Sequence, residues 1–187
     1  MISPLIPRAE VAAYGDLPSP APHSDAELAT LLDLLTAPGV RIATVAVGHS
    51  RDAASRSSAA AFVAAWREIG RQPVLAMVDW PESAASWLRA AHRFTAEEPD
   101  AWVVAAAPLG WAQMSRRLRH STDWDPARTY DFAALGDSRL PALAGAATLQ
   151  GMRGATADGG TWAIDRGWVT QQPPARRKPP LRPHGTL

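Results

Sequence analysis

The sequence of 187 residues contains no cysteine, a single lysine and no long apolar run. Without cysteine the chain has no disulfide, no thiol catalyst and no cysteine-ligated metal. The only lysine, Lys178, lies near the carboxyl terminus and outside every expected strand–helix turn, which excludes a phosphate-binding P-loop. No window approaches the roughly 20 apolar residues that cross a bilayer, so we expect no membrane insertion.

Charge and histidine spacing exclude further classes. A formal net charge of +1 gives no general reason to expect nucleic acid or an anionic membrane as partner. The histidines lack metal-ligand spacing, and we predict neither a metal site nor a cofactor. The first residues, MISPLIPRAE, lack the basic segment and apolar core of a secretory signal. We therefore expect a cytoplasmic protein.

Prolines divide the chain into three parts. Residues 1–24 form a proline-rich N-terminal arm with at most one helical turn around Arg8–Tyr14, and residues 1–7 are expected to lack packing. Residues 25–170 are expected to form a single α/β domain. Residues 171–187 are expected to form a basic, proline-rich disordered tail, because they show no apolar period.

Within the domain, apolar runs alternate with helical segments. Ser24 and Glu27 have the spacing of a capping box and predict the start of a first helix. Buried strands are then predicted at residues 40–47, 74–79 and 102–106, and helices at 52–70, 81–98 and 110–121. Buried strands linked by helices are typical of a parallel sheet. The predicted fold class is α/β, a three-layer open parallel sheet with helices on both faces, flavodoxin-like.

The pattern changes after His120. A short strand is predicted near Tyr130–Ala134, and two β-rich segments, residues 148–153 and 161–164, flank the glycine-rich turn ADGG. These segments predict a C-terminal β-hairpin that pairs with the sheet or covers its edge.

Three turns at the carboxyl ends of the predicted strands form the candidate site. Such turns converge at one edge of an open α/β sheet, and ligands bind there. The indoles are expected to act as apolar walls and the polar groups to orient a ligand. The candidate ligand-binding residues are His49, Ser50 and Arg51 in the first turn, Asp79 and Trp80 in the second, and Gly110 and Trp111 in the third.

The first turn also admits an enzymatic interpretation. Gly48-His49-Ser50-Arg51 matches four positions of the G-x-S-x-G nucleophile elbow, but Asp52 occupies the fifth, where a small residue is needed. A dinucleotide-binding turn is excluded because this turn holds only one of the required glycines. A serine hydrolase using Ser50 therefore remains one alternative. A scaffold protein that binds partners through its arm, tail and hairpin is another.

Residues 41–118 resemble one lobe of a type I periplasmic binding protein, the substrate-binding component of branched-chain amino-acid ABC transporters. The helix segment AFVAAWREIG precedes PV as in that family, and EEPDAWVVAA matches its proline–aspartate before a strand. The resemblance covers about 80 residues. It implies a non-enzymatic lobe that binds a polar small molecule such as an amino acid, with His49, Ser50, Asp79 and Trp80 in the ligand-contacting loops. Closing a cleft would require a homodimer or a second-lobe partner.

Overall fold

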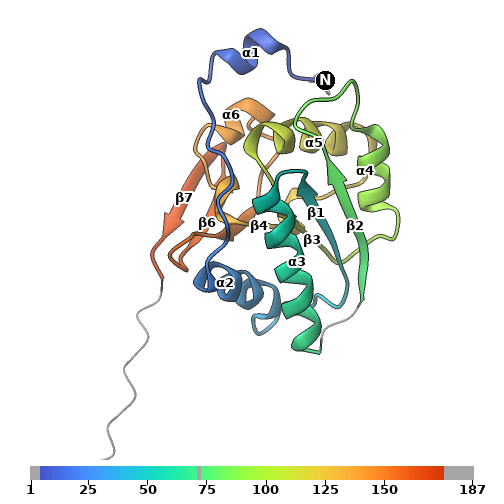
Figure 1. Cartoon of the computed structure of the whole chain (residues 1–187), viewed down its shortest axis with the longest axis vertical. Coiled ribbons are helices and arrows are strands. Elements are labelled where there is room, and N and C mark those ends of the chain that lie inside the picture. Colours follow the sequence, from blue (N-terminus) through green and yellow to red (C-terminus); the bar gives the residue numbers. More distant parts are fainter. Residues whose placement is uncertain (1–4, 71–72, 175–187) are drawn as a thin grey trace, which may run out of the picture.

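The computed structural model describes residues 5–70 and 73–174 of the chain. Strands form one mixed sheet in the order β2-β1-β3-β4-β5-β6-β7, with helices on both faces (Figure 1). The elements are α1 (Arg8–Ala12), α2 (Asp25–Thr36), β1 (Val45–Ser50), α3 (Ala53–Glu68), β2 (Val74–Trp80), α4 (Leu88–Thr95), β3 (Ala101–Ala105), α5 (Pro108–Ser121), β4 (Thr129–Asp131), α6 (Leu140–Ala144), β5 (Arg153–Ala155), β6 (Thr161–Asp165) and β7 (Trp168–Gln172). Short 3-10 turns occupy Pro126–Arg128 and Ala133–Leu135.

The sheet confirms the predicted α/β class. Strands β2, β1, β3, β4 and β5 run parallel, and β6 and β7 continue the sheet in antiparallel pairing. Of the three strands predicted from the apolar runs, β1 lies between β2 and β3 and pairs with both in parallel, as expected for units joined by crossover helices. The antiparallel pair at one end makes the sheet mixed.

Two apolar clusters separate the helices into layers. On one face, α2 and α3 cover the sheet through Leu31, Leu35, Phe62 and Trp66. On the other face, α4, α5 and α6 cover it through a second cluster that includes Phe94, Met114, Leu118, Leu140 and Leu143. Helix α3, which follows β1, and α5, which follows β3, therefore lie on opposite faces of two adjacent strands. This reversal makes the β1–β3 boundary the topological switch point of the sheet.

Local sequence signals set several helix ends. The Ser24 hydroxyl accepts a hydrogen bond from the Glu27 N–H at 3.0 Å, and the Glu27 carboxylate accepts one from the Ser24 N–H at 3.4 Å, as the capping box predicts. Asp52 caps α3 by accepting from the Ser55 N–H at 2.8 Å. Gly70 follows α3 at a φ of 73°, which favours glycine.

The starts of two predicted elements, β1 and α4, differ from the structure. Strand β1 begins at Val45 instead of Val40, because the Asp100 side chain accepts the N–H groups of Ala43 and Thr44 that a longer strand would use. The helix expected at residues 81–98 begins only at Leu88. Residues 81–87 form a loop in which the Trp87 indole donates to the Pro81 carbonyl at 3.0 Å.

The C-terminal hairpin is present with shifted limits. Strands β5 and β6 pair around the glycine-rich turn, but residues 148–152 form a turn instead of the predicted strand. Gly151 has a φ of 89°, and its N–H donates to the Ile164 carbonyl. Strand β7 adds an unpredicted edge strand that includes residues 171–172 of the expected tail. The rest of the tail prediction, from residue 175 onward, lies outside the described residues.

The arm packs on the domain more than its prolines suggest. Helix α1 confirms the predicted helical turn, and the arm crosses the carboxyl ends of the strands (Figure 1). Ile6 is 6% exposed, and its N–H donates to the Gln113 side chain at 3.0 Å. The predicted lack of packing in residues 1–7 is therefore wrong at Ile6. The Arg139 guanidinium anchors the arm further on by donating to the carbonyls of Tyr14 and Asp16.

Candidate functional site

The three predicted turns meet through one hydrogen-bond network. The Ser50 hydroxyl donates to Glu82 Oε1 at 2.6 Å and accepts from the Ala107 N–H at 3.0 Å. Glu82 Oε2 accepts from the Gly110 N–H at 2.7 Å. We call this group, Ser50, Glu82, Ala107 and Gly110, the Ser50–Glu82 network. It ties the ends of β1, β2 and β3 together.

Glu82 is the central acceptor of this network, and it is not among the predicted site residues. Burial raises the pKa of its carboxyl, while the hydrogen bonds from Ser50 and Gly110 lower it less. The Glu82 carboxylate caps the start of α5, not the start of the predicted helix at Pro81. Gly110 is required for this approach, since a Cβ there would lie 2.4 Å from Glu82 Oε1.

The two indoles of the predicted site are core residues. Trp80 and Trp111 are both 0% exposed, and their rings lie 5.6 Å apart. Gly48 allows this packing, because a Cβ there would lie 2.5 Å from the Trp80 ring. The expectation that these indoles form the walls of a ligand site is corrected: they pack inward, where a ligand at the sheet edge does not reach them.

Of the remaining predicted residues, His49 lies in the core, whereas Arg51 and Asp79 lie at the exposed rim of the sheet edge. His49 is largely buried, and its Nδ1–H donates to the Ser50 carbonyl at 2.8 Å. Arg51 and Asp79 form an ion pair at 2.5 Å, with side chains 60% and 42% exposed. The Arg51 hydrogen bond lowers the pKa of Asp79. Only this pair presents charge to solvent at the predicted site.

The geometry of Ser50 does not fit a nucleophile. The Ser50 side chain is fully buried, and its hydroxyl proton is directed to the Glu82 carboxylate. The imidazole of His49 is hydrogen-bonded to a backbone carbonyl. A serine nucleophile needs an exposed oxygen and a base that removes its proton. Neither condition is met at Ser50.

A cavity lies beside this network, at the switch point. Its volume is about 220 Å³. It lies where β3 and β4 end and where α3 begins after β1, and the arm covers it. The lining residues are Ser19, Pro20, Ala21, Pro22, Glu27, Ser55, Ser58, Ala105, Ala106, Phe132, Ala133, Ala134 and Ala157. None of the residues predicted from the three turns lines it.

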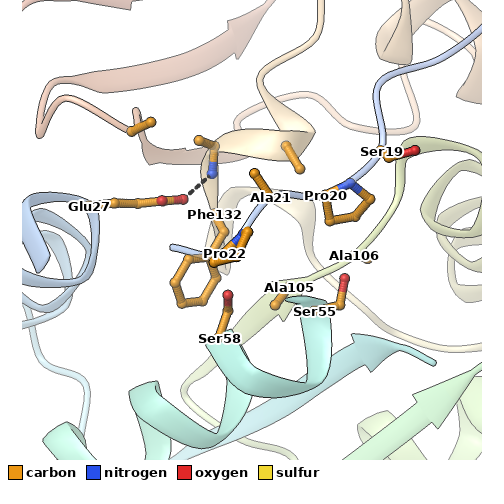
Figure 2. A pocket seen from close by; sticks show the side chains of 13 residues that line it. Ser19, Pro20, Ala21, Pro22, Glu27, Ser55, Ser58, Ala105, Ala106 and Phe132 are labelled. Atoms are coloured by element: carbon orange, nitrogen blue, oxygen red, sulfur yellow. Dashed lines mark hydrogen bonds between the residues drawn. The ribbon is translucent and has the colours of Figure 1, made fainter. Parts of the chain in front are cut away.

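Few polar side chains line the switch-point cavity, and they come from α2, α3 and the arm (Figure 2). The Ser55 hydroxyl is buried and has no hydrogen-bond partner. The Ser58 hydroxyl lies 3.3 Å from His23 Nδ1. The buried Glu27 carboxylate accepts from the Ala133 N–H at 2.6 Å, the bond that Figure 2 marks between α2 and the segment after β4.

Sequence reasoning missed these cavity residues. Ser55 and Ser58 lie in an alanine- and serine-rich helix, and small polar residues are common on the exposed side of such a helix. Their spacing of three residues puts both on one face of the helix, and this spacing was the signal in the sequence that could have identified them. Glu27 was assigned to the capping box alone, a role that it does fulfil.

Comparison with known proteins identifies the fold. No protein-family model matches the chain, and no curated protein matches its sequence. A solved structure of a putative branched-chain amino acid ABC transporter from Rhodospirillum rubrum aligns over 68% of this chain and 36% of its own, with 23% identity and a TM-score of 0.57. A substrate-binding periplasmic protein from Ralstonia solanacearum aligns over 74% of this chain and 38% of its own, with 18% identity and a TM-score of 0.61.

An extracellular ligand-binding receptor from Rhodopseudomonas palustris is similar as well. It aligns over 75% of this chain and 36% of its own, with 16% identity and a TM-score of 0.56. The chain therefore has the fold of one lobe of a type I periplasmic binding protein, as the sequence resemblance predicted. It spans little more than a third of the length of these similar structures.

These comparisons overturn the predicted location. The similar structures are described as periplasmic or extracellular proteins, which contradicts the expectation of a cytoplasmic protein. In the part of the chain that the structure describes, no helix has the length and apolar character to cross a bilayer. Over the same residues, no three acidic or histidine side chains gather as a metal site would require.

Proposed function

We propose that this chain is a ligand-binding lobe and that it binds a compact small molecule in the switch-point cavity. The main evidence is the Ser55 hydroxyl. It is buried and has no hydrogen-bond partner, although Ser55 lines the cavity. Buried polar groups in proteins are nearly always hydrogen-bonded, so an unpaired one beside a cavity points to a ligand. The position at the switch point supports the same conclusion.

The size of the cavity supports a small ligand. Its volume of about 220 Å³ is below the ~300–1,000 Å³ of most ligand pockets. The walls are mostly alanine, proline and Phe132, with hydroxyl and carboxylate groups at a few points. A ligand with a short apolar body and one polar head group fits this lining.

The predicted residues keep a more limited role in this proposal. Arg51 and Asp79 form an exposed ion pair at the rim of the sheet edge and do not line the cavity. Ser50 and Gly110 hold the loops in place through Glu82. Closure of a cleft by a second copy of the chain stays a prediction, and sedimentation velocity with and without ligand tests it.

Backbone NMR of the full chain tests the binding site. Titration with amino acids, nucleosides and short acyl compounds should shift the amide signals of Ser55, Ser58 and Ala133 for at least one class. Ala134→Phe, which fills the cavity from its lining, should abolish the shifts. Ala142→Phe, on an exposed position of α6 outside the cavity, is the matched control. Shifts confined to Arg51 and Asp79 would place the ligand at the rim and refute the cavity site.

A further inference from the structure

The switch-point cavity contains a buried negative charge without a counter-charge. Glu27 is 4% exposed. Its carboxylate accepts hydrogen bonds from two neutral backbone groups, the N–H of Ala133 and that of Ser24. Over the residues that the structure describes, Glu27 takes part in no ion pair. The N-terminus of α2 stabilises this charge in part, but no cationic side chain among the described residues is paired with it, although such pairing is usual for a buried carboxylate.

The other groups that line the cavity do not supply a cationic side chain. Glu27 is the only charged residue among them, and none is lysine or arginine. The start of α3, which would favour an anion, is already occupied by the Asp52 carboxylate. The charged lining of the cavity is therefore acidic, and a ligand carboxylate would face Glu27 without a basic side chain as partner.

Hydrogen-bonding capacity in the cavity favours a donor. Oε2 of Glu27 accepts one long bond, at 3.4 Å, and a carboxylate oxygen has two lone pairs. The Ser55 hydroxyl has no partner and can accept. An ammonium group offers three donors and no acceptor, so it suits the free acceptor capacity of Glu27, while the Ser55 hydroxyl lies on the other side of the cavity (Figure 2).

From these observations we infer that the cavity takes a small ligand with a cationic amine head and no carboxylate, with the amine held by Glu27. This inference rests on the proposed function, since it names the ligand class of the same cavity. The ammonium would pair with Glu27, and the apolar body would lie against Phe132 and the alanines of the lining. Charge-assisted hydrogen bonds of this kind are stronger than neutral ones.

Three probes of one shape test the head group. Isobutylamine, isobutanol and isobutyrate are titrated into the isotope-labelled full chain, and the amide shifts of Ser55 and Ser58 report binding. We expect the amine to bind at least tenfold more tightly than the carboxylate, with the alcohol between them. Glu27→Gln, which keeps an acceptor for the Ala133 N–H, should remove the advantage of the amine over the alcohol. Asp33→Asn, an exposed acid on the same helix, should leave it unchanged.

The possible results separate the two proposals. Equal binding of all three probes, or tightest binding of isobutyrate, would overturn the inference on charge and leave the cavity as the binding site. Absence of binding by any probe, together with a negative ligand panel, would overturn the proposed function itself. The comparison of amine with carboxylate needs only the natural chain, so it decides the inference even where Glu27→Gln fails to fold.

Discussion

Two groups of polar residues lie at the same edge of the sheet, and they differ in how their hydrogen bonds are satisfied. In the Ser50–Glu82 network, hydroxyl, carboxylate and backbone N–H groups satisfy one another. In the switch-point cavity, the Ser55 hydroxyl is unpaired, and Glu27 accepts backbone hydrogen bonds but forms no ion pair among the described residues. A closed network contributes to stability, whereas unsatisfied groups beside a cavity are available to a ligand. Polar residues near one edge of the sheet thus stabilise the fold in one group, and in the other they are the groups that we propose bind a ligand.

The largest expected effect on stability comes from removing Glu82, the central acceptor of the Ser50–Glu82 network. Glu82→Ala leaves the Ser50 hydroxyl and the Gly110 N–H without their partner, and each unsatisfied buried group costs about 1–3 kcal/mol. We expect the free energy of unfolding, measured in urea, to fall by about 3 kcal/mol. Glu68→Ala, at an exposed position of α3, should change it by less than about 0.5 kcal/mol. A fall below about 1 kcal/mol for Glu82→Ala would show that the network is not structural.

A buried acid outside both groups provides a pH test. Burial raises the pKa of Asp131 well above its ordinary value of 3.8, and neither carboxyl oxygen has a hydrogen-bond partner. Because the folded state prefers the protonated form, its contribution to stability is complete below pH 3.8 and is lost as pH rises toward the folded pKa. Asp131→Asn should therefore unfold at a higher temperature than the natural chain at pH 7, with a smaller difference at pH 4. A constant difference across this range would contradict the raised pKa.

The direct comparison of the two groups uses one substitution in each. Ser50→Ala removes a hydroxyl that makes two hydrogen bonds and should lower the free energy of unfolding by about 1–3 kcal/mol. Ser55→Ala removes a hydroxyl without a partner and should leave stability unchanged or raise it by about 1 kcal/mol. Chemical denaturation of both variants measures the contrast. Equal losses would mean that the two serines have the same structural role.

The smallest effect is expected at the rim. Arg51 and Asp79 form an ion pair that is exposed to solvent, and such pairs contribute about 0–1 kcal/mol. Arg51→Gln should change the melting temperature by no more than a degree or two, and 1 M salt should remove even that difference. A loss comparable to that of Glu82→Ala would show that the pair belongs to the structural network.

The sequence predicted the fold well where the signals were local. The alternation of apolar runs and helices identified three parallel strands, and Ser24 and Glu27 marked the start of α2. The start of β1 was predicted wrongly because a distant side chain intervenes there: Asp100 accepts the N–H groups of residues 43 and 44. Hydrogen bonds between segments dozens of residues apart leave no periodic trace in the sequence.

By itself the sequence determined the fold class and which ends of the strands meet at one edge of the sheet. Apolar periodicity dictates strands and helices, and parallel strands must place their carboxyl ends together. Only the tertiary structure decided which polar groups at that edge would find hydrogen-bond partners. Glu82 reached Ser50 and Gly110, and the indoles of Trp80 and Trp111 turned into the core. The arm crossed over Ser55 and Ser58 and left a cavity beneath it. Burial and pairing depend on which segments meet in space, and the order of residues along the chain does not record that.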